Sequence, residues 1–107
     1  MNNKDTEIFL DYLNRRIRLT QERKEHILEH PEMKGQLAWI SDTLLNPEVV
    51  VATKADKTVH VYHRYYPITT VASKYLLVAV KIGIDDAFVL TAFFSNRQKK
   101  GVIVWMA

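Results

Sequence analysis

The sequence predicts an α+β fold, in which one or two short N-terminal strands and two helices precede a mainly antiparallel, twisted sheet of four to five strands. Apolar residues recur at helical spacing before residue 46, whereas the chain from residue 49 onward is rich in β-branched and aromatic residues. The gaps between the later strands are too short for crossover helices, which favours antiparallel pairing. With 107 residues, the chain is expected to form a single domain over residues 1–107.

The N-terminal strands come first along the chain. Residues 7–13 mix apolar and polar positions and fit either a short strand or a frayed helix. Residues 16–19 are predicted to form a strand, because Ile17 and Leu19 alternate with two arginines.

Two helices follow, divided at Pro31. Thr20 is a good N-cap, and Glu22 lies in the first turn, where the helix dipole favours a carboxylate, so the first helix is expected over about residues 21–30. Pro31 disfavours helical geometry in the residue before it and can itself open a second helix. Apolar residues at helical spacing then continue to Leu45, where an Asn-Pro pair ends the segment.

Five segments of the second half have strand character. They are residues 49–53, 58–66, 75–82, 87–95 and 102–106. The first two flank a polar turn and predict a hairpin, while the third and fourth are apolar enough to be central strands with helices covering one face. A loop is expected at residues 67–73 and a basic turn at 96–101.

The composition excludes several classes of protein. The absence of cysteine excludes disulfides, a thiolate nucleophile and thiolate metal ligands, and it fits a cytoplasmic location. The N-terminus has no signal-peptide pattern, and the longest apolar runs, near 75–80 and 87–94, are too short to span a membrane as helices. We therefore expect no membrane partner. The sequence does not choose between a monomer and a homodimer.

Positive charge is concentrated in the second half. Residues 1–48 hold 7 basic and 9 acidic side chains, a net charge of −2, whereas residues 49–107 hold 8 and 3, a net charge of +5. Clustered lysine and arginine create a field that attracts polyanions, although a solvated basic surface is the alternative.

The first candidate site is on the first helix. Arg23, His26 and His30 are spaced i, i+3 and i+7 and share one helix face, and histidine titrates near neutrality, which suits general acid–base catalysis. The alternative is that His30 belongs to the Pro31 junction and His26 is an ordinary surface residue.

A zinc site is a further alternative for the same helix. The stretch from His26 to His30 matches the H-x-x-E-H metalloprotease pattern, with Glu29 as the base. Catalytic zinc needs a third protein ligand, and Pro31 ends the helix at once. We expect no metal and no cofactor.

The second candidate site is the strand at 58–66. Alternation places His60, Tyr62, Arg64 and Tyr66 on one face, which could stack bases and hold phosphates. The alternative is an amphipathic strand whose tyrosines reach only the rim.

The third candidate site combines a hydroxyl with the basic turn. Thr91 lies within an apolar run, with Val89 and Phe93 as its period-2 companions, and it gains importance if His26 approaches it across the sheet. Arg97, Lys99 and Lys100 follow, where cations can hold phosphate or form a solvated turn.

Three stretches carry a family resemblance. They are Ile17-Arg18-Leu19-Thr20-x-Glu22-Arg23-x-x-His26-Ile27 with His30-Pro31-Glu32, then Leu45-Asn46-Pro47-Glu48-Val49, and Phe88-Val89-Leu90-Thr91-Ala92-Phe93-Phe94. Together they resemble small bacterial and phage proteins of the barnase/EndoU/colicin/RelE-like nuclease superfold, in its phage-associated branch. The likeness extends from about residue 15 to 105.

The resemblance implies a metal-independent endoribonuclease, either the toxin of a toxin–antitoxin pair with an antitoxin-like partner or a phage-derived nuclease domain. It implies that His26 is the general base or acid, Arg64 the phosphate clamp, Thr91 the hydroxyl of the sheet and Glu32 an orienting group. The expected RNA-binding residues are Arg23, His30, His60, Tyr62, Tyr66, Arg97, Lys99 and Lys100. A non-catalytic RNA- or protein-binding module of the same fold is the alternative, because fold alone does not establish function.

Overall fold

The computed structural model describes residues 6–67, 69, 72 and 74–107. Its elements in chain order are β1 (Glu7–Leu10), β2 (Arg16–Leu19), α1 (Gln21–Leu28), the 3₁₀ helix η2 (Pro31–Met33), α2 (Leu37–Leu45), β3 (Val49–Ala52), β4 (Val59–Tyr66), β5 (Lys74–Ile82), β6 (Ala87–Ser95) and β7 (Val102–Met106). The loop predicted at 67–73 falls largely outside the described residues.

The strands of the described part form one sheet in the order β1-β2-β6-β5-β4-β3-β7. The pairs are antiparallel except for β2 and β6, which are parallel and meet at Arg18 and Phe88. The predicted α+β class with a mainly antiparallel sheet is confirmed. The predicted count of four to five strands is too low, because β1 and β2 join the same sheet through the long-range pairing with β6. That pairing joins residues far apart in the chain and leaves no local sequence pattern.

The first helix begins where the sequence predicts. The Thr20 side chain caps α1, with its Oγ1 accepting from the Arg23 backbone N–H at 3.3 Å. The helix ends at Leu28, two residues earlier than expected, since His30 already adopts an extended conformation before Pro31.

The second helix begins later than expected. Pro31 opens only the short 3₁₀ helix η2, and Gly35 then adopts a φ of +74°, a left-handed conformation that breaks the helical path. The α-helix α2 starts at Leu37.

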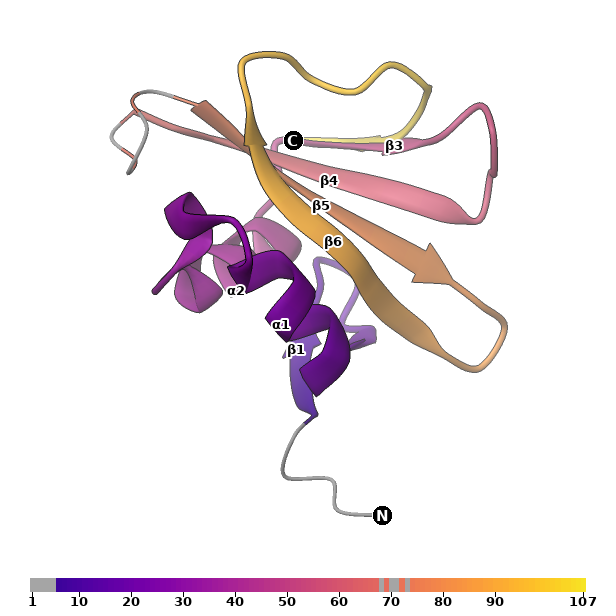
Figure 1. Cartoon of the computed structure of the whole chain (residues 1–107). Coiled ribbons are helices and arrows are strands. Elements are labelled where there is room, and N and C mark those ends of the chain that lie inside the picture. Colours follow the sequence, from indigo (N-terminus) through magenta and orange to yellow (C-terminus); the bar gives the residue numbers. More distant parts are fainter. Residues whose placement is uncertain (1–5, 68, 70–71, 73) are drawn as a thin grey trace.

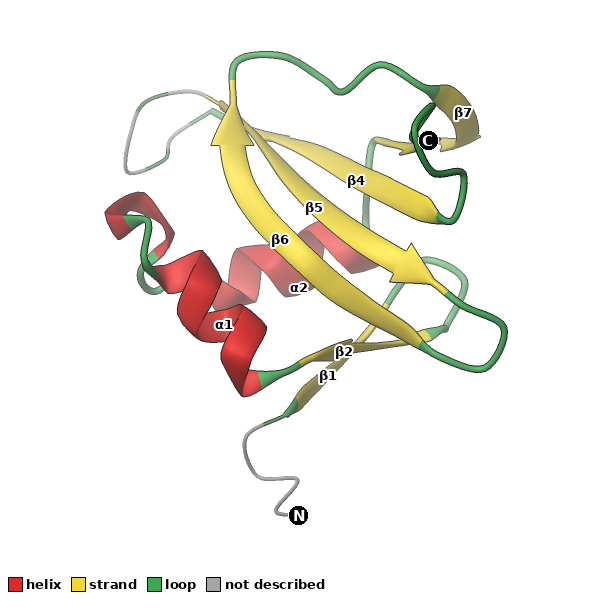
Figure 2. Cartoon of the chain, turned by 45° about the vertical axis from the view of Figure 1, so that its right-hand side comes forward, coloured by secondary structure: helices red, strands yellow, loops and turns green. Residues whose placement is uncertain are grey.

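The two α-helices lie on the same face of the sheet, where α1 packs along β6 and α2 packs against β5, β4 and β1 (Figures 1 and 2). We call this the inner face. The fully buried core lies between the helices and this face and includes Ile27, Ile40, Leu44, Leu76 and Val78. In the described part of the chain no helix covers the opposite, outer face, which carries a smaller apolar cluster of Val49, Val51, Val61 and Leu77.

A buried carboxylate fixes the turn between β1 and β2. Asp11 is fully buried and accepts hydrogen bonds from the Leu13 and Arg15 backbone N–H groups, from Arg15 Nε at 2.9 Å and from the Tyr62 hydroxyl at 2.6 Å. These contacts join the N-terminal hairpin to the middle of β4. Burial, and then the bond to Asp11, raise the pKa of Tyr62, so its hydroxyl stays protonated and donates.

The described residues have a radius of gyration of 13.1 Å, close to the value of about 13 Å that is usual for a compact domain of this size. No helix in the described ranges is both long and apolar enough to cross a membrane.

Candidate nucleic-acid interface

The outer face of the sheet presents three aromatic rings on three neighbouring strands. Strand pairing places Tyr65 opposite Tyr75 and Leu77 opposite Phe93, and all four side chains share the outer face. The rings of Tyr65 and Tyr75 meet edge to face with centroids 5.2 Å apart. Tyr65 is 42% exposed and Phe93 38% exposed. Exposed aromatic rings on a sheet are suited to stacking with unpaired bases.

A basic segment crosses the outer face after β6. Arg97, Lys99 and Lys100 are all exposed, and the Lys99 backbone N–H donates to Nε2 of His63, a buried residue of β4, at 2.9 Å. No ion pair among the described residues engages Arg97, Lys99 or Lys100. Their positive charges therefore remain available to an anion beside the aromatic rings.

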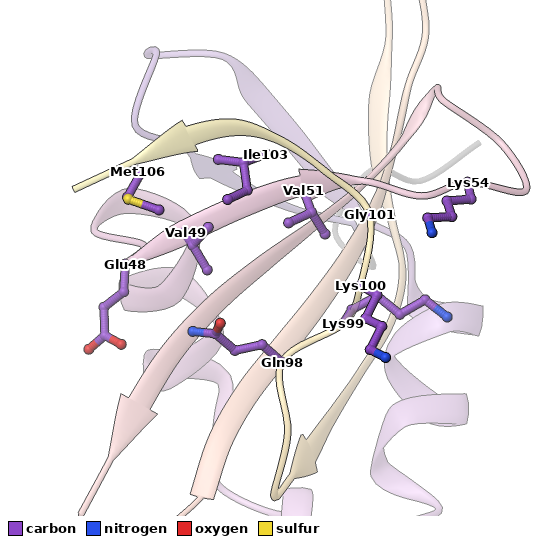
Figure 3. A pocket seen from close by; sticks show the side chains of 10 residues that line it. All are labelled: Glu48, Val49, Val51, Lys54, Gln98, Lys99, Lys100, Gly101, Ile103 and Met106. Carbon is purple, nitrogen blue, oxygen red and sulfur yellow. The ribbon is translucent and has the colours of Figure 1, made fainter.

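Two cavities flank this basic segment. The first has a volume of about 360 Å³, with an apolar floor from β3 and β7 and lysines on its rim (Figure 3). Its lining residues include Val49, Val51, Ile103, Met106, Lys54, Lys99 and Lys100. The second, of about 490 Å³, lies between the β3–β4 turn at Thr53–Ala55 and the same Gln98–Lys100 segment. Both hollows combine a surface concavity with cations.

The predicted histidine site lies on the helix side of the molecule. His26 is exposed on α1, with its Nδ1 4.0 Å from a Glu29 carboxylate oxygen, and His30 is exposed at the start of η2. Arg23 is half-buried on the same helix, and Glu32 is half-buried within η2. Both imidazoles are exposed, but His30 lies beyond the end of α1 in an extended conformation, so the helix face expected to join Arg23, His26 and His30 is not formed.

Arg64 does not lie free on the surface. Its Nε is 3.2 Å from the Asp42 carboxylate, and its Nη1 donates to the Asn46 carbonyl at 2.8 Å, so it fastens β4 to the C-terminal end of α2. A phosphate bound there would compete with both contacts.

Thr91 lies on the opposite face of the sheet from α1. A bulge at Leu90 shifts the register, so Val89 pairs with Val80 of the core, whereas Thr91 pairs with Ala79 of the outer face. The alternation expected between Val89, Thr91 and Phe93 is therefore broken, and the sheet separates Thr91 from His26. Thr91 instead shares the outer face with Phe93.

The face of β4 proposed for base stacking is the inner one. Tyr62 is fully buried, and Tyr66 stacks on Trp39 of α2 with ring centroids 4.5 Å apart and donates to Asp42 at 2.9 Å. Burial raises the pKa of Tyr66 to about 12. His60 is half-buried, and burial followed by the nearby Arg15 charge lowers its pKa. Tyr62 therefore supports the N-terminal hairpin, and Tyr66 supports α2.

The outer-face residues of β4 are the ones that the sequence interpretation missed. Val59 and Val61 begin this face and make it look like a core face, yet His63 and Tyr65 continue it. The sequence did hold one hint in β5, where Tyr75 alternates with Leu77, Ala79 and Lys81 and therefore lies on the same face as these residues. Only the pairing of the two strands brings Tyr65 and Tyr75 together.

The described residues contain no group of three or more His, Asp or Glu side chains arranged to hold a metal ion. In particular, no described residue joins His26 and His30 as a third metal ligand.

Comparison with known proteins gives one match. The family model described as phage-Barnase-EndoU-ColicinE5/D-RelE like nuclease2 matches residues 2–106. No curated protein and no solved structure matches the chain. The resemblance inferred from the sequence motifs is confirmed, and the match spans nearly the whole chain. The chain belongs to the phage-Barnase-EndoU-ColicinE5/D-RelE like nuclease 2 family.

Proposed function

We propose that this nuclease-like domain acts on RNA as a metal-independent endoribonuclease and that the outer sheet face binds the strand. The observation that carries the proposal is the combination of exposed aromatic rings with uncommitted cations on one face: Tyr65 and Phe93 beside Lys99 and Lys100. Stacking on aromatic rings together with backbone neutralisation is the common way in which proteins hold single strands.

In the proposed chemistry the 2′-hydroxyl oxygen attacks the adjacent phosphorus, the bond from phosphorus to the 5′-oxygen breaks, and the products are a 2′,3′-cyclic phosphate and a 5′-hydroxyl that takes its proton from water. His26 is the group proposed to take the proton of the 2′-hydroxyl, since its imidazole is exposed and lies on α1, which packs along β6. β6 carries Phe93 on the outer face, and its pairing with β2 is recorded only at Phe88, so RNA on the outer face is proposed to cross the edge of β6 beyond Phe88 to reach α1 on the inner face. Arg23, on the same helix, is proposed to stabilise the developing phosphorane charge.

The roles proposed for Arg64 and Thr91 differ from those expected from the sequence, because of the contacts that these residues make. Arg64 acts as a phosphate clamp only if RNA displaces Asp42, and Thr91 is proposed to contact the strand on the outer face. Arg97, Lys99 and Lys100 are proposed to contact phosphates, and His30 is proposed to contact RNA beside His26.

The test is cleavage of RNA by the purified protein in the presence of a chelator. We expect wild type to cut, and we expect His26→Ala to cut about 10²- to 10⁴-fold more slowly, as removal of a positioned acid or base does. Glu25→Ala, which changes an exposed residue next to His26, is the matched control and should leave the rate unchanged. Equal rates for wild type and His26→Ala would remove His26 from the mechanism.

A second function is favoured by a specific observation. The residues expected to form one catalytic cluster do not converge, since Arg64 is engaged by α2 and Thr91 lies across the sheet from α1. The protein would then be an RNA-binding module without the reaction. Salt-sensitive RNA binding with no cleavage over hours supports this alternative, because phosphate contacts weaken steeply as salt rises.

The proposal includes a role as a toxin with an antitoxin-like partner. Expression in a bacterial host should then arrest growth, with cellular RNA cut in wild type and intact in His26→Ala. Normal growth at a verified protein level would argue against the toxin role while leaving RNA binding to be judged by the purified protein.

A further inference from the structure

His63 is a fully buried histidine whose two ring nitrogens both contact backbone. Its Nδ1 lies 3.2 Å from the Val49 carbonyl oxygen, and its Nε2 lies 2.9 Å from the Lys99 backbone nitrogen. It sits in the middle of the outer face, between Val49 of β3 and Leu77 of β5. Its two partners belong to different parts of the chain, β3 and the basic segment after β6.

The two contacts specify the charge state of the ring. A backbone N–H can only donate, so Nε2 must accept from Lys99 and carry no proton. A carbonyl can only accept, so Nδ1 carries the proton and donates to Val49. The ring that satisfies both is the neutral imidazole. A protonated ring would point a second N–H at the Lys99 N–H and would lose that contact.

The Lys99 contact holds the segment that carries the free cations. Residues Gln98–Lys100 line both cavities on the outer face, and in the described residues 96–101 the His63 bond is the side-chain anchor that joins this segment to the centre of the sheet. Two further side-chain contacts lie at the start of the segment: the Lys74 ammonium group at the beginning of β5 donates to Asn96 Oδ1, and Ser95 bonds Arg97 within the turn. Lys74 holds the start of the segment at Asn96, whereas the position of Lys99 over the centre of the sheet depends on His63.

We propose that His63 is a positioning residue that holds the basic segment over the outer face in its neutral form only, so that RNA binding weakens when the ring is protonated. This inference rests on the proposed RNA-binding function. Burial lowers the pKa of His63, which agrees with a neutral ring at physiological pH.

Four charged residues line the cavity that adjoins Val49 and Lys99, the two backbone partners of His63. Glu48 precedes β3, Lys54 follows it, and Lys99 and Lys100 belong to the segment itself. The facing residues of β5 and β6, Leu77 and Phe93, are apolar. Glu48 is the one acidic side chain among the cavity-lining residues, and it contacts β4 through its backbone N–H, which donates to the His63 carbonyl at 2.8 Å.

Two substitutions separate positioning from a general structural role. His63→Gln supplies a neutral acceptor of similar reach that does not titrate, whereas His63→Leu fills the same space without an acceptor. Binding of a single-stranded RNA oligonucleotide to each protein is measured from mildly alkaline to mildly acidic pH. The other three histidines are present in all three proteins, so the ratio of wild-type to His63→Gln affinity isolates His63.

We expect wild type and His63→Gln to bind equally above neutral pH. In mildly acidic solution wild type should bind about three- to tenfold more weakly than His63→Gln, the range that loss of one hydrogen bond produces. His63→Leu should bind weakly at every pH. A pH profile of wild type that parallels that of His63→Gln would overturn the proposal.

Amide hydrogen exchange, measured without RNA, keeps this test separate from the proposed function. The Lys99 amide should be protected in wild type and His63→Gln at neutral pH, unprotected in His63→Leu, and should lose protection in wild type alone as the solution is acidified. Protection that never changes would contradict the positioning role even if RNA binds. Protection that behaves as expected in a protein that binds no RNA would instead refute the proposed function and leave the positioning role standing.

Discussion

Asp11 draws together the backbone of the β1–β2 turn, the Arg15 guanidinium and the Tyr62 hydroxyl in a fully buried position. Removing the hydroxyl leaves the buried carboxylate with one donor fewer. We predict that Tyr62→Phe lowers the free energy of unfolding by about 1–3 kcal/mol, the usual effect of losing a buried hydrogen bond to a charged group. Urea denaturation measures it. Tyr65→Phe removes a hydroxyl from an exposed tyrosine of the same strand and should change stability by less than about 0.5 kcal/mol.

The histidines of β4 make stability depend on pH. Burial lowers the pKa of both His60 and His63, so the folded protein binds fewer protons than the unfolded chain. The contribution of each is fully present above its ordinary pKa of about 6.5 and declines as the pH falls toward its lowered folded value. We predict that the free energy of unfolding of wild type decreases from neutral to mildly acidic pH, and that His63→Gln decreases less steeply. Parallel curves for the two proteins would contradict this assignment.

At the scale of elements, the N-cap of α1 is the clearest local stabilising interaction. Thr20 satisfies the Arg23 N–H, which has no partner within the helix at that position. We predict that Thr20→Ala lowers the free energy of unfolding by about 0.5–2 kcal/mol, whereas Thr20→Ser, which keeps the hydroxyl, has a much smaller effect. Thermal or urea denaturation checks the pair, and equal losses in both variants would show that the hydroxyl is not the stabilising group.

The edge pair of β3 and β7 depends on close backbone approach at Gly101. A Cβ added there would lie 2.4 Å from the Ala52 carbonyl oxygen, and a backbone atom cannot yield as a flexible side chain can. We predict that Gly101→Ala destabilises the protein by about 1–3 kcal/mol, as overpacking does. Faster amide exchange in β7 than in β5 would locate the damage, and unchanged exchange in β7 would contradict it.

The sequence was informative where local signals dominate. The cap at Thr20, the break at Pro31 and the strand segments of the second half follow from residues that are close in sequence. The structure agrees with them, except that α1 ends earlier, at Leu28, and α2 starts later, at Leu37. The main error of the sequence interpretation was the choice of which face of β4 is exposed. Tyr62 and Tyr66 have the composition of a binding face, but the helices and Asp11 cover them. Which face the helices cover is a tertiary property.

The candidate site was predictable only in part for the same reason. Arg97, Lys99 and Lys100 follow from a simple run of cations, and they do lie exposed on the outer face. Tyr65 and Tyr75 come together only through strand pairing. Thr91 lies on the outer face because of a bulge at Leu90, which no residue type predicts. Contacts between distant segments leave little trace in a single sequence.

At the scale of the whole molecule, the two faces of the sheet carry different kinds of residues. The inner face carries the core and the helices, while the outer face combines aromatic rings, two cavities and a basic segment. Three of the cations that give residues 49–107 their net charge, Arg97, Lys99 and Lys100, thereby lie next to surfaces that can stack bases. This division supports RNA as the ligand of the outer face.

Salt-dependent binding of a single-stranded RNA oligonucleotide tests that central claim most directly. The double variant Lys99→Ala/Lys100→Ala removes two cations from the outer face, and Arg16→Ala/Lys34→Ala removes two exposed cations from other elements as the charge-matched control. We predict that wild-type affinity falls steeply as salt rises. The slope of log affinity against log salt should flatten by about 1.4 in the Lys99/Lys100 variant, because each phosphate contact to a single strand contributes about 0.7, and it should stay near the wild-type value in the control. Equal slopes in the two double variants, or an affinity that does not respond to salt, would contradict the account.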